Sequence, residues 1–254
     1  MSVFWLILII IIVYFAIINI IIISNINKIP NISLSDVLDK AQTGDILISS
    51  SNISQFTEET NMRFPLYKRL WFCFSKYIQK GVTGPWTHVG LIIRDGNTVY
   101  LLEAVSDDIY KYDLLKKIPC STGLRLINLS DKIIDYNGIC AWQPLYSLKK
   151  ELPNFEYIKN NLISVLYDKK FKVKATDVIK TIFFGPNINK PGSYPIMDKE
   201  HIMCSETLYY LYYKLGIVTG KYDASQVFPH MYGNKFIDLT DSYKLGDPMI
   251  IKPN

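Results

Sequence analysis

The first 27 residues of this chain contain no charged side chain, whereas the whole chain of 254 residues has 28 basic and 23 acidic ones. Within this segment, residues 3–23 are apolar except for Asn19. A helix of that length reaches roughly 30 Å, the thickness of the hydrocarbon core of a bilayer. No basic residue precedes the run, and it is longer than the apolar core of a cleaved signal peptide. We therefore predict an uncleaved membrane anchor, with a cleaved signal or a buried helix as the alternatives.

The rest of the chain has the composition of an ordinary globular domain, with charged and apolar residues mixed throughout. This composition excludes a disordered chain, a collagen, a coiled coil and a protein with several membrane spans. We predict a transmembrane anchor over residues 1–27, a polar linker over 28–35 and one domain over 36–254. Few charges flank the apolar run, so the orientation of this single-pass protein in the membrane stays open.

The net charge of +5 is modest, and the basic pairs are scattered among acidic residues. Nucleic-acid binding would need a basic stripe within a recognisable motif, which the sequence lacks. The expected partner is therefore the lipid bilayer, contacted through residues 3–23, and not a nucleic acid, while the oligomeric state stays open. The four cysteines form no C-x-x-C pair, which argues against a zinc ribbon or a dithiol redox motif.

Local patterns predict a mixture of strands and helices in the domain. An Asp-Gly pair between two β-rich runs is a strong hairpin signal, and it predicts strands over 87–93 and 98–105. Further strands are expected over residues 46–48, 123–129 and 139–145. Helical periodicity and stop signals predict helices over residues 35–40 with Ser35 as the cap, 65–80, 153–167, 177–184 and 203–215. These elements indicate an α+β fold, with a small antiparallel sheet flanked by helices.

Cys204 falls at the start of the helix predicted over 203–215. At such a position the free backbone N–H groups and the positive end of the helix dipole favour a thiolate over a thiol. The same N–H groups can stabilise an oxyanion. A lone cysteine at a helix start is more often a small buried residue, so the position of Cys204 alone is a weak signal.

A cysteine nucleophile works with a histidine and a third group that orients the imidazole. His88 begins a predicted strand, and the alternation of that strand places it on the same face as Gly90, whose small size leaves room for another group. Glu103 lies on the return strand, about opposite His88 or one pair away, within side-chain reach. The run around Glu103 is otherwise apolar, and a buried carboxylate without a partner costs several kcal/mol. Glu103 is therefore expected to have a partner.

Four short motifs occur in an order that characterises one enzyme family. They are Thr-Gly-Asp-Ile-Leu at 43–47, Thr-His-Val-Gly-Leu-Ile at 87–92, Tyr-Leu-Leu-Glu-Ala at 100–104 and Cys-Ser-Glu-Thr-Leu at 204–208. Over about residues 36–232 the chain resembles the permuted papain-like cysteine hydrolases, the circularly permuted branch of the NlpC-type superfamily. That branch includes bacterial YiiX- and YaeF-like proteins and members from poxviruses and other large DNA viruses. In papain-like enzymes the cysteine helix precedes the histidine strand, and in this branch, as here, it follows that strand.

The resemblance implies a papain-like (NlpC-type) domain and assigns roles to three residues. Cys204 would be the nucleophile, His88 the general base and acid, and Glu103 the group that orients His88. The reaction implied is acyl transfer from an amide, ester or thioester through a thioester intermediate, without a metal or an organic cofactor. Substrates in the superfamily include peptide amides, cell-wall peptides and lipid acyl groups.

Three other polar residues of these motifs have simpler explanations. Asp45 fits a turn or capping residue. Ser205 and Glu206 fit the first turn of a helix, where the dipole favours an acidic side chain. We therefore expect these three residues to be structural.

Two other functions stay open on the sequence alone. The domain could be catalytically silent and act as a membrane-anchored structural or binding protein, for example in a virion. Alternatively, its cysteine and histidine side chains could bind a metal. The abundance of Ile, Asn, Lys and Tyr is typical of an AT-rich genome and compatible with a large DNA virus, in which case the anchor would lie in a host or virion membrane.

Overall fold

The computed structural model describes residues 26–51, 85–148, 151–167, 169–171 and 201–253, together with the single positions 13, 17, 24 and 188. Within these residues, no helix is both long enough and apolar enough to cross a bilayer. Nearly all of residues 3–23 lies outside the described residues, and so do the helices predicted over 65–80 and 177–184.

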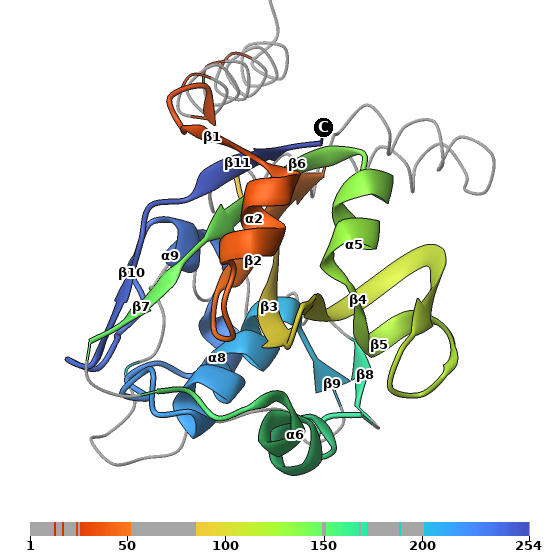
Figure 1. Cartoon of the computed structure of the whole chain (residues 1–254). Coiled ribbons are helices and arrows are strands. Elements are labelled where there is room, and N and C mark those ends of the chain that lie inside the picture. The colour runs from red at the N-terminus through yellow and green to blue at the C-terminus, as the bar shows by residue number, and fades with distance from the viewer. Residues whose placement is uncertain are drawn as a thin grey trace, which may run out of the picture.

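A seven-stranded sheet forms the centre of the domain, in the spatial order β1-β11-β6-β2-β3-β4-β5 (Figure 1). Its strands are β1 Asn31–Ser33, β2 Ile46–Ser51, β3 His88–Asp95, β4 Thr98–Asp113, β5 Ile118–Asn128, β6 Gly138–Gln143 and β11 Met249–Lys252. Neighbouring strands are antiparallel except for β1 and β11, which run parallel. The α+β class is thus confirmed, but the prediction of a small sheet is wrong. β1 and β11 come from opposite ends of the domain, and no local sequence pattern predicts that they pair.

Smaller elements surround this sheet. Two short pairs form outside it, β7 Leu145–Ser147 with β10 Tyr243–Leu245, and β8 Lys170–Phe171 with β9 His201–Ile202. The helices are α2 Leu34–Lys40, α5 Leu129–Asp135, α6 Phe155–Ile158, α8 Cys204–Lys214 and α9 Pro229–Gly233. A π-helical turn, Lys159–Ile163, continues α6, and a 3₁₀ turn, Ala224–Gln226, precedes α9.

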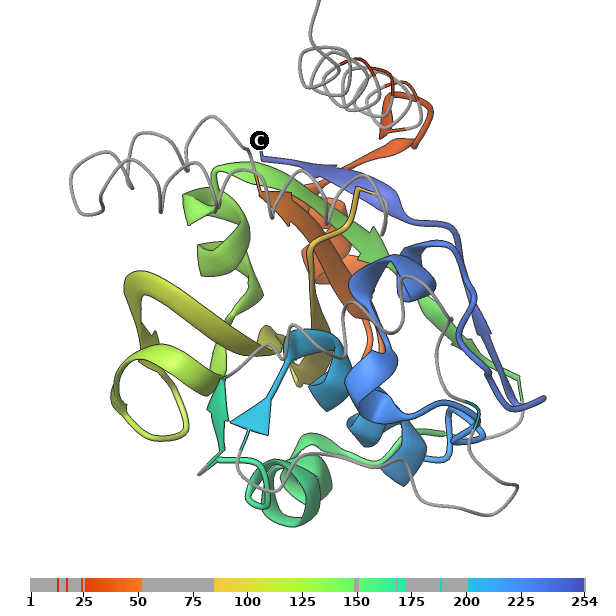
Figure 2. The same ribbon diagram turned by 180° about the vertical axis from the view of Figure 1, so that it is seen from behind.

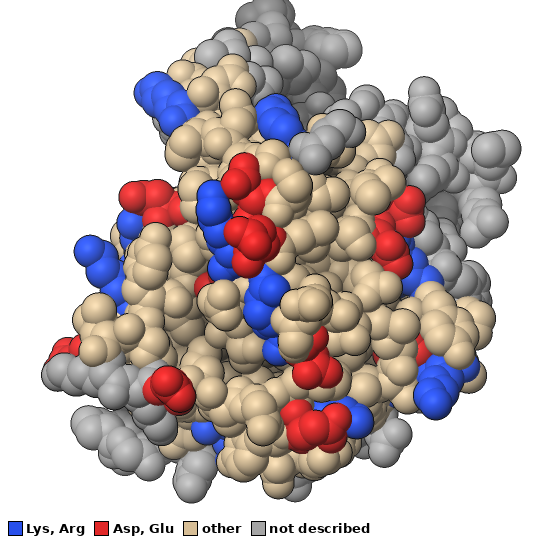
Figure 3. Space-filling view, in the orientation of Figure 1, with Lys and Arg blue, Asp and Glu red and all other residues tan. Residues whose placement is uncertain are grey.

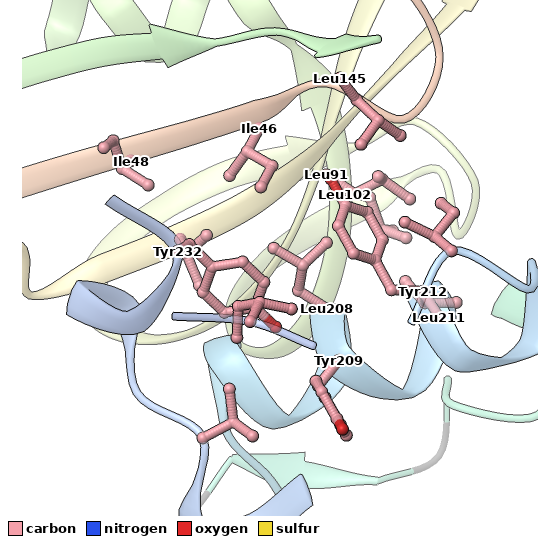
Figure 4. Packing of buried hydrophobic residues seen from close by; sticks show 14 of the residues in the cluster. Ile46, Ile48, Leu91, Leu102, Leu145, Leu208, Tyr209, Leu211, Tyr212 and Tyr232 are labelled. Carbon is pink, nitrogen blue, oxygen red and sulfur yellow. The ribbon is translucent and has the colours of Figure 1, made fainter. Parts of the chain in front are cut away.

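Two apolar layers cover the two faces of the sheet. α2 and α5 lie over the face seen in Figure 1, and α8 lies over the opposite face, seen in Figure 2. The alternation of β3 places Leu91 in the layer under α8 and Ile92 in the layer under α2 and α5. Figure 4 shows Leu208 and Tyr212 of α8 packed with Leu91 and other side chains of the sheet. Side chains on opposite faces of β3 therefore belong to different layers.

The β3–β4 hairpin has an asymmetry that matters for the site. In β3 the N–H of Ile92 donates to the carbonyl of Asp45, toward β2. Because N–H groups alternate in direction along a strand, those of Val89 and Leu91 point the other way, toward β4. The pairing of β3 with β4 ends at Leu91 and Leu102, whereas β4 continues alongside β5. The backbone N–H of Val89 therefore points to a place where β4 has separated from β3.

The helix predicted over 203–215 is confirmed as α8. Its C-terminus is followed by Gly216, which has a φ of 73° and so occupies the left-handed conformation that glycine adopts without strain. α8 contacts both β3 and β4. Its N-terminal residue, Cys204, packs against the layer on the α8 face of the sheet.

Two details near the start of the domain differ from the prediction. The cap of α2 is Ser33 and not Ser35, because the Ser33 hydroxyl accepts a hydrogen bond from Asp36 N at 3.0 Å. Residues 28–35 also do not form a free linker, since β1 within them joins the sheet. The preceding Ile26 is buried in the core, and Ile250 N donates to the carbonyl of Pro30 at 2.8 Å. The domain therefore begins before residue 36.

The surface over α2 and α5 carries charges of both signs. Figure 3 shows basic and acidic side chains interspersed on this face rather than gathered by sign. Asp36 and Lys40 of α2, for example, form an exposed ion pair of 2.8 Å. Such exposed pairs contribute little to stability, about 0–1 kcal/mol.

Candidate active site

His88 and Glu103 form a short hydrogen bond on the face of the sheet that α2 and α5 cover. His88 Nε2 lies 2.7 Å from Glu103 Oε2. One residue beyond the last ladder pair, Leu91 with Leu102, Glu103 lies beside Gly90, which is on the same face of β3 as His88. This position agrees with the sequence prediction that Glu103 lies within side-chain reach of His88. The His88 side chain retains 18% of its exposure, while that of Glu103 is fully buried. The imidazole can therefore be reached from outside, but the carboxylate cannot.

Gly90 is required for this close approach. A Cβ atom at position 90 would lie 2.7 Å from Leu101 Cδ1, 3.0 Å from the carbonyl oxygen of Leu102 and 3.3 Å from Glu103 Cβ. The carbonyl oxygen belongs to the backbone and cannot rotate away. The space that Gly90 leaves is thus filled by the hairpin's return strand, which carries Glu103.

Cys204 completes the group from the other side of the sheet. Its side chain is half-buried and is hydrogen-bonded to His88. The backbone N–H groups of Val89 and Ser205 also donate to the Cys204 sulfur. One of these donors comes from the strand that carries His88, and the other from the first turn of α8.

The separation of β4 from β3 explains how residues from two faces meet. Val89 N–H would have continued the ladder to β4, and instead it donates to Cys204 Sγ. The N-terminus of α8 thus reaches the end of the β3–β4 ladder. At this point Cys204, from the α8 face, contacts His88, from the α2 and α5 face.

Glu103 is held by two further cationic side chains. Arg125, its cross-strand partner on β5, donates to Glu103 Oε1 from Nε at 3.0 Å and from Nη2 at 2.8 Å. Lys132 Nζ from α5 lies 2.9 Å from Oε2, the oxygen that His88 contacts, and donates to Oε1 at 3.3 Å. Arg125 and Lys132 are both buried. The carboxylate therefore has partners on both oxygens, which satisfies the expectation that it be paired.

The charges in this group shift one another's pKa values. Burial by itself lowers the pKa of His88, but the charges of Cys204 and Glu103 and their hydrogen bonds outweigh it and raise the pKa to about 9. Burial raises the pKa of Cys204, yet the nearby His88 imidazolium and the two backbone donors lower it overall. For Glu103, the opposing effect of burial is outweighed by Lys132, His88 and Arg125, which hold its pKa well below its usual range. Near neutral pH these directions favour a thiolate, an imidazolium and a carboxylate.

The other described cysteines lack these features. Burial raises the pKa of Cys140 to about 12, so its thiol stays protonated near neutral pH. Cys120 is buried, and its thiol contacts the carbonyl of Thr122 at 3.1 Å. Cys73 lies outside the described residues. Cys204, by contrast, is hydrogen-bonded to His88, and its pKa is lowered.

The remaining histidines lie elsewhere. Burial lowers the pKa of His230 to about 4, and its ring stacks on Phe228 at 6.2 Å between centroids. His201 belongs to the short strand β9. Neither is among the groups that shift the pKa of Cys204.

The polar residues expected to be structural have structural contacts. Glu206 accepts a hydrogen bond from Met203 N at 3.2 Å, which caps α8. The Ser205 hydroxyl donates to the carbonyl of Val227 at 2.6 Å and so ties α8 to the turn before α9. Asp45 accepts hydrogen bonds from the backbone of Gln42 and Leu145 and from the indole of Trp142, at 2.8–2.9 Å. It links the 42–45 turn to the end of β6.

Arg125 and Lys132 were missed at the sequence level. Arg125 sits between Leu124 and Leu126 in a predicted strand, and a charged residue on the sheet was a signal of the same kind as Glu103. Lys132 gave no comparable signal, because α5 itself was not predicted. Its place at Glu103 follows only from the way α5 packs on the sheet.

No protein-family model matches this sequence, and none of the curated proteins does. Among the described residues, no group of three or more His, Cys, Asp and Glu side chains could hold a metal ion. What the site can do must therefore be inferred from its side chains and their surroundings.

Proposed function

We propose that this protein is a cysteine hydrolase or acyltransferase with a permuted papain-like domain, held at a membrane by residues 3–23. Its substrate would be an amide, an ester or a thioester. One observation carries the proposal, the continuous hydrogen-bonded chain from Cys204 through His88 to Glu103. A buried cysteine that only fills space has no need of an imidazole next to its sulfur or of a carboxylate behind that imidazole.

The proposed reaction begins from the thiolate. Because His88 Nε2 contacts Glu103, the other ring nitrogen, Nδ1, is the one that shares a proton with Cys204. The Cys204 sulfur attacks the carbonyl carbon, and backbone N–H groups at the start of α8 stabilise the oxyanion. As the bond from that carbon to the leaving group breaks, the imidazolium gives its proton to the leaving group. A thioester between Cys204 and the acyl group remains.

The second half returns the site to its starting state. Water, or the hydroxyl or amine of an acceptor, attacks the thioester carbonyl while His88 takes up the attacking group's proton. The carbon–sulfur bond then breaks, the acyl product leaves, and Cys204 is again a thiolate beside the His88 imidazolium. Throughout both steps Glu103 stays ionised and keeps the imidazole in place.

Labelling with an electrophilic thiol probe tests the assignment of Cys204. The full-length protein in detergent is treated at neutral pH, and the labelled peptide is located by mass spectrometry. We expect labelling at Cys204, no labelling in Cys204→Ala, and unchanged labelling in the control Cys140→Ala, since the Cys140 thiol is buried and protonated. Equal labelling of wild type and Cys204→Ala would contradict the proposal.

Turnover of a panel of ester, thioester, amide and phospholipid substrates then tests the reaction. Replacement of His88 by Asn should lower the rate of acyl transfer by about 10²–10⁴-fold, the usual contribution of general acid–base catalysis. A protein whose Cys204 reacts with the probe but which turns over none of these substrates would instead favour a silent, structural domain.

A further inference from the structure

Besides the His88 imidazolium, two buried cations, Arg125 and Lys132, contact the single negative charge of Glu103. Arg125 alone places two donors on Oε1 and neutralises the carboxylate. Lys132 adds a second buried cation, whose Nζ lies 2.9 Å from the opposite oxygen, Oε2, and 3.3 Å from Oε1. Removing an ammonium group from water costs several kcal/mol, so a second cation needs an explanation beyond charge balance.

The position of the Lys132 ammonium supplies that explanation. Lys132 Nζ and His88 Nε2 lie 2.9 Å and 2.7 Å from the same atom, Glu103 Oε2. The two nitrogens therefore lie within about 6 Å of each other, close enough for their charges to interact. The ammonium also lies over the Tyr136 ring, 4.9 Å from its centroid, and Leu129 and Ile133 anchor its helix in the core. Lys132 is thus held in place independently of His88.

We propose that Lys132 is a positioning residue of this site: by sharing Glu103 Oε2 with His88, it reduces the hold of the carboxylate on the imidazolium proton. This inference rests on the proposed function. With Arg125 alone, the imidazolium would face an oxygen of Glu103 that no other cation shares, and it would hold its proton more tightly. A general acid must release its proton to the leaving group at the working pH, so an imidazolium held too tightly is a poor acid.

The other groups that face His88 do not provide this effect. Among the described residues, the titratable and charged groups recorded around His88 and Glu103 are Cys204 from α8, Glu103 from β4, Arg125 from β5, Lys132 from α5, Tyr136 after α5 and Cys140 from β6. Burial raises the pKa of both Tyr136 and Cys140, so both are neutral near neutral pH. Cys204 and Glu103 favour the imidazolium, and Arg125 contacts the far oxygen. Lys132 is the cation that contacts the same oxygen as His88.

The test titrates the imidazolium through two alkylating reagents. Iodoacetate is an anion and is attracted to an imidazolium beside the thiolate, whereas iodoacetamide is neutral. The ratio of their rates at Cys204 in the full-length protein therefore falls as His88 loses its proton. In Lys132→Met the midpoint of this fall should rise by about 1 pH unit, because a charge at this distance alters a neighbour's pKa by that order. Lys132→Arg, which keeps the charge, should restore a midpoint close to that of the wild type.

Lys111→Met is the matched control. Lys111 also joins a strand to α5, through the carbonyl of Asp131 at 2.9 Å and the carboxylate of Asp135 at 2.8 Å, but it does not contact Glu103. In Lys111→Met the pH midpoint of the fall in the iodoacetate-to-iodoacetamide rate ratio should equal that of the wild type. A folded Lys132→Met with an unchanged or lowered midpoint would overturn the proposal, and Lys132→Gln provides a second neutral variant. If neither neutral variant folds while Lys132→Arg does, Lys132 acts only on stability and the proposal is likewise overturned.

The two proposals fail in different ways. An unreactive Cys204 in the wild type would count against the proposed function. A reactive Cys204 whose midpoint does not respond to the charge at position 132 would count against the role of Lys132 alone.

Discussion

Replacing Glu103 by Gln should destabilise the domain strongly, because this carboxylate forms ion pairs with two buried cations, Arg125 and Lys132. Arg125 and Lys132 retain their charges in Glu103→Gln but lose their ion pairs of 2.8 Å and 2.9 Å with Glu103. Breaking a buried ion pair by removing one partner costs about 3–5 kcal/mol. In a domain of this size that loss lowers the melting temperature by roughly 10 °C. It is also a large part of a typical total stability of about 5–15 kcal/mol.

Thermal unfolding of the full-length protein, followed by circular dichroism, measures this loss. The control is Glu156→Gln, which removes a carboxylate from an exposed ion pair with Lys159 and should change stability by less than about 1 kcal/mol. A double variant, Glu103→Gln with Lys132→Met, removes one of the stranded cations. It should therefore be more stable than Glu103→Gln, with a coupling energy between positions 103 and 132 of about 1–3 kcal/mol.

Two results would refute this reasoning. One is a Glu103→Gln protein that melts within about 2 °C of the wild type, which would mean that the two cations do not depend on the carboxylate. The other is a double variant that is less stable than Glu103→Gln. In that case Lys132 would contribute through its packing, and its charge would not be the source of the cost.

Three further predictions concern single positions. Gly90→Ala should cost about 1–3 kcal/mol in urea unfolding, because its Cβ would lie 2.7 Å from Leu101 Cδ1, and an unchanged urea midpoint would contradict the tight fit. Ser33→Ala should cost about 1 kcal/mol in urea unfolding and Ser35→Ala clearly less, since Ser33 caps α2; equal losses would contradict this. Burial raises the pKa of Asp45 from 3.8 to about 6, so the folded state holds this proton more tightly than the unfolded state does. The shift therefore does not reduce the free energy of unfolding below about pH 4, where Asp45 is protonated in both states, and reduces it by ~3 kcal/mol at about pH 7. The stability of the wild type relative to Asp45→Asn should fall over that range, and a difference that does not change with pH would refute this.

Local patterns were enough to predict the elements that carry the candidate site. The Asp-Gly turn predicted the hairpin, and with it that Glu103 lies opposite His88 or one pair away, within side-chain reach. The stop signal at Gly216 and the periodicity before it identified the helix that begins at Cys204. These features depend on neighbours in the sequence, which is why they could be predicted without a structure.

The parts that were missed depend on contacts between distant segments. β1 joins β11 across almost the whole domain, and nothing near residues 31–33 announces that pairing. The cap of α2 was misplaced by two residues because Ser33 and Ser35 are both good capping residues, and only the hydrogen bond to Asp36 distinguishes them. Lys132 could not be connected to Glu103 before α5 was placed on the sheet.

The break in the β3–β4 ladder places the candidate site between the two apolar layers of the domain. Cys204 packs against the layer under α8, while the His88 and Glu103 side chains lie on the face that α2 and α5 cover. The sulfur and the imidazole therefore lie on opposite faces of the sheet. The distance between them depends on how the two layers pack against that sheet. A small change in packing deep in either core, far from any substrate, would shift that separation and so tune the reactivity of the thiol.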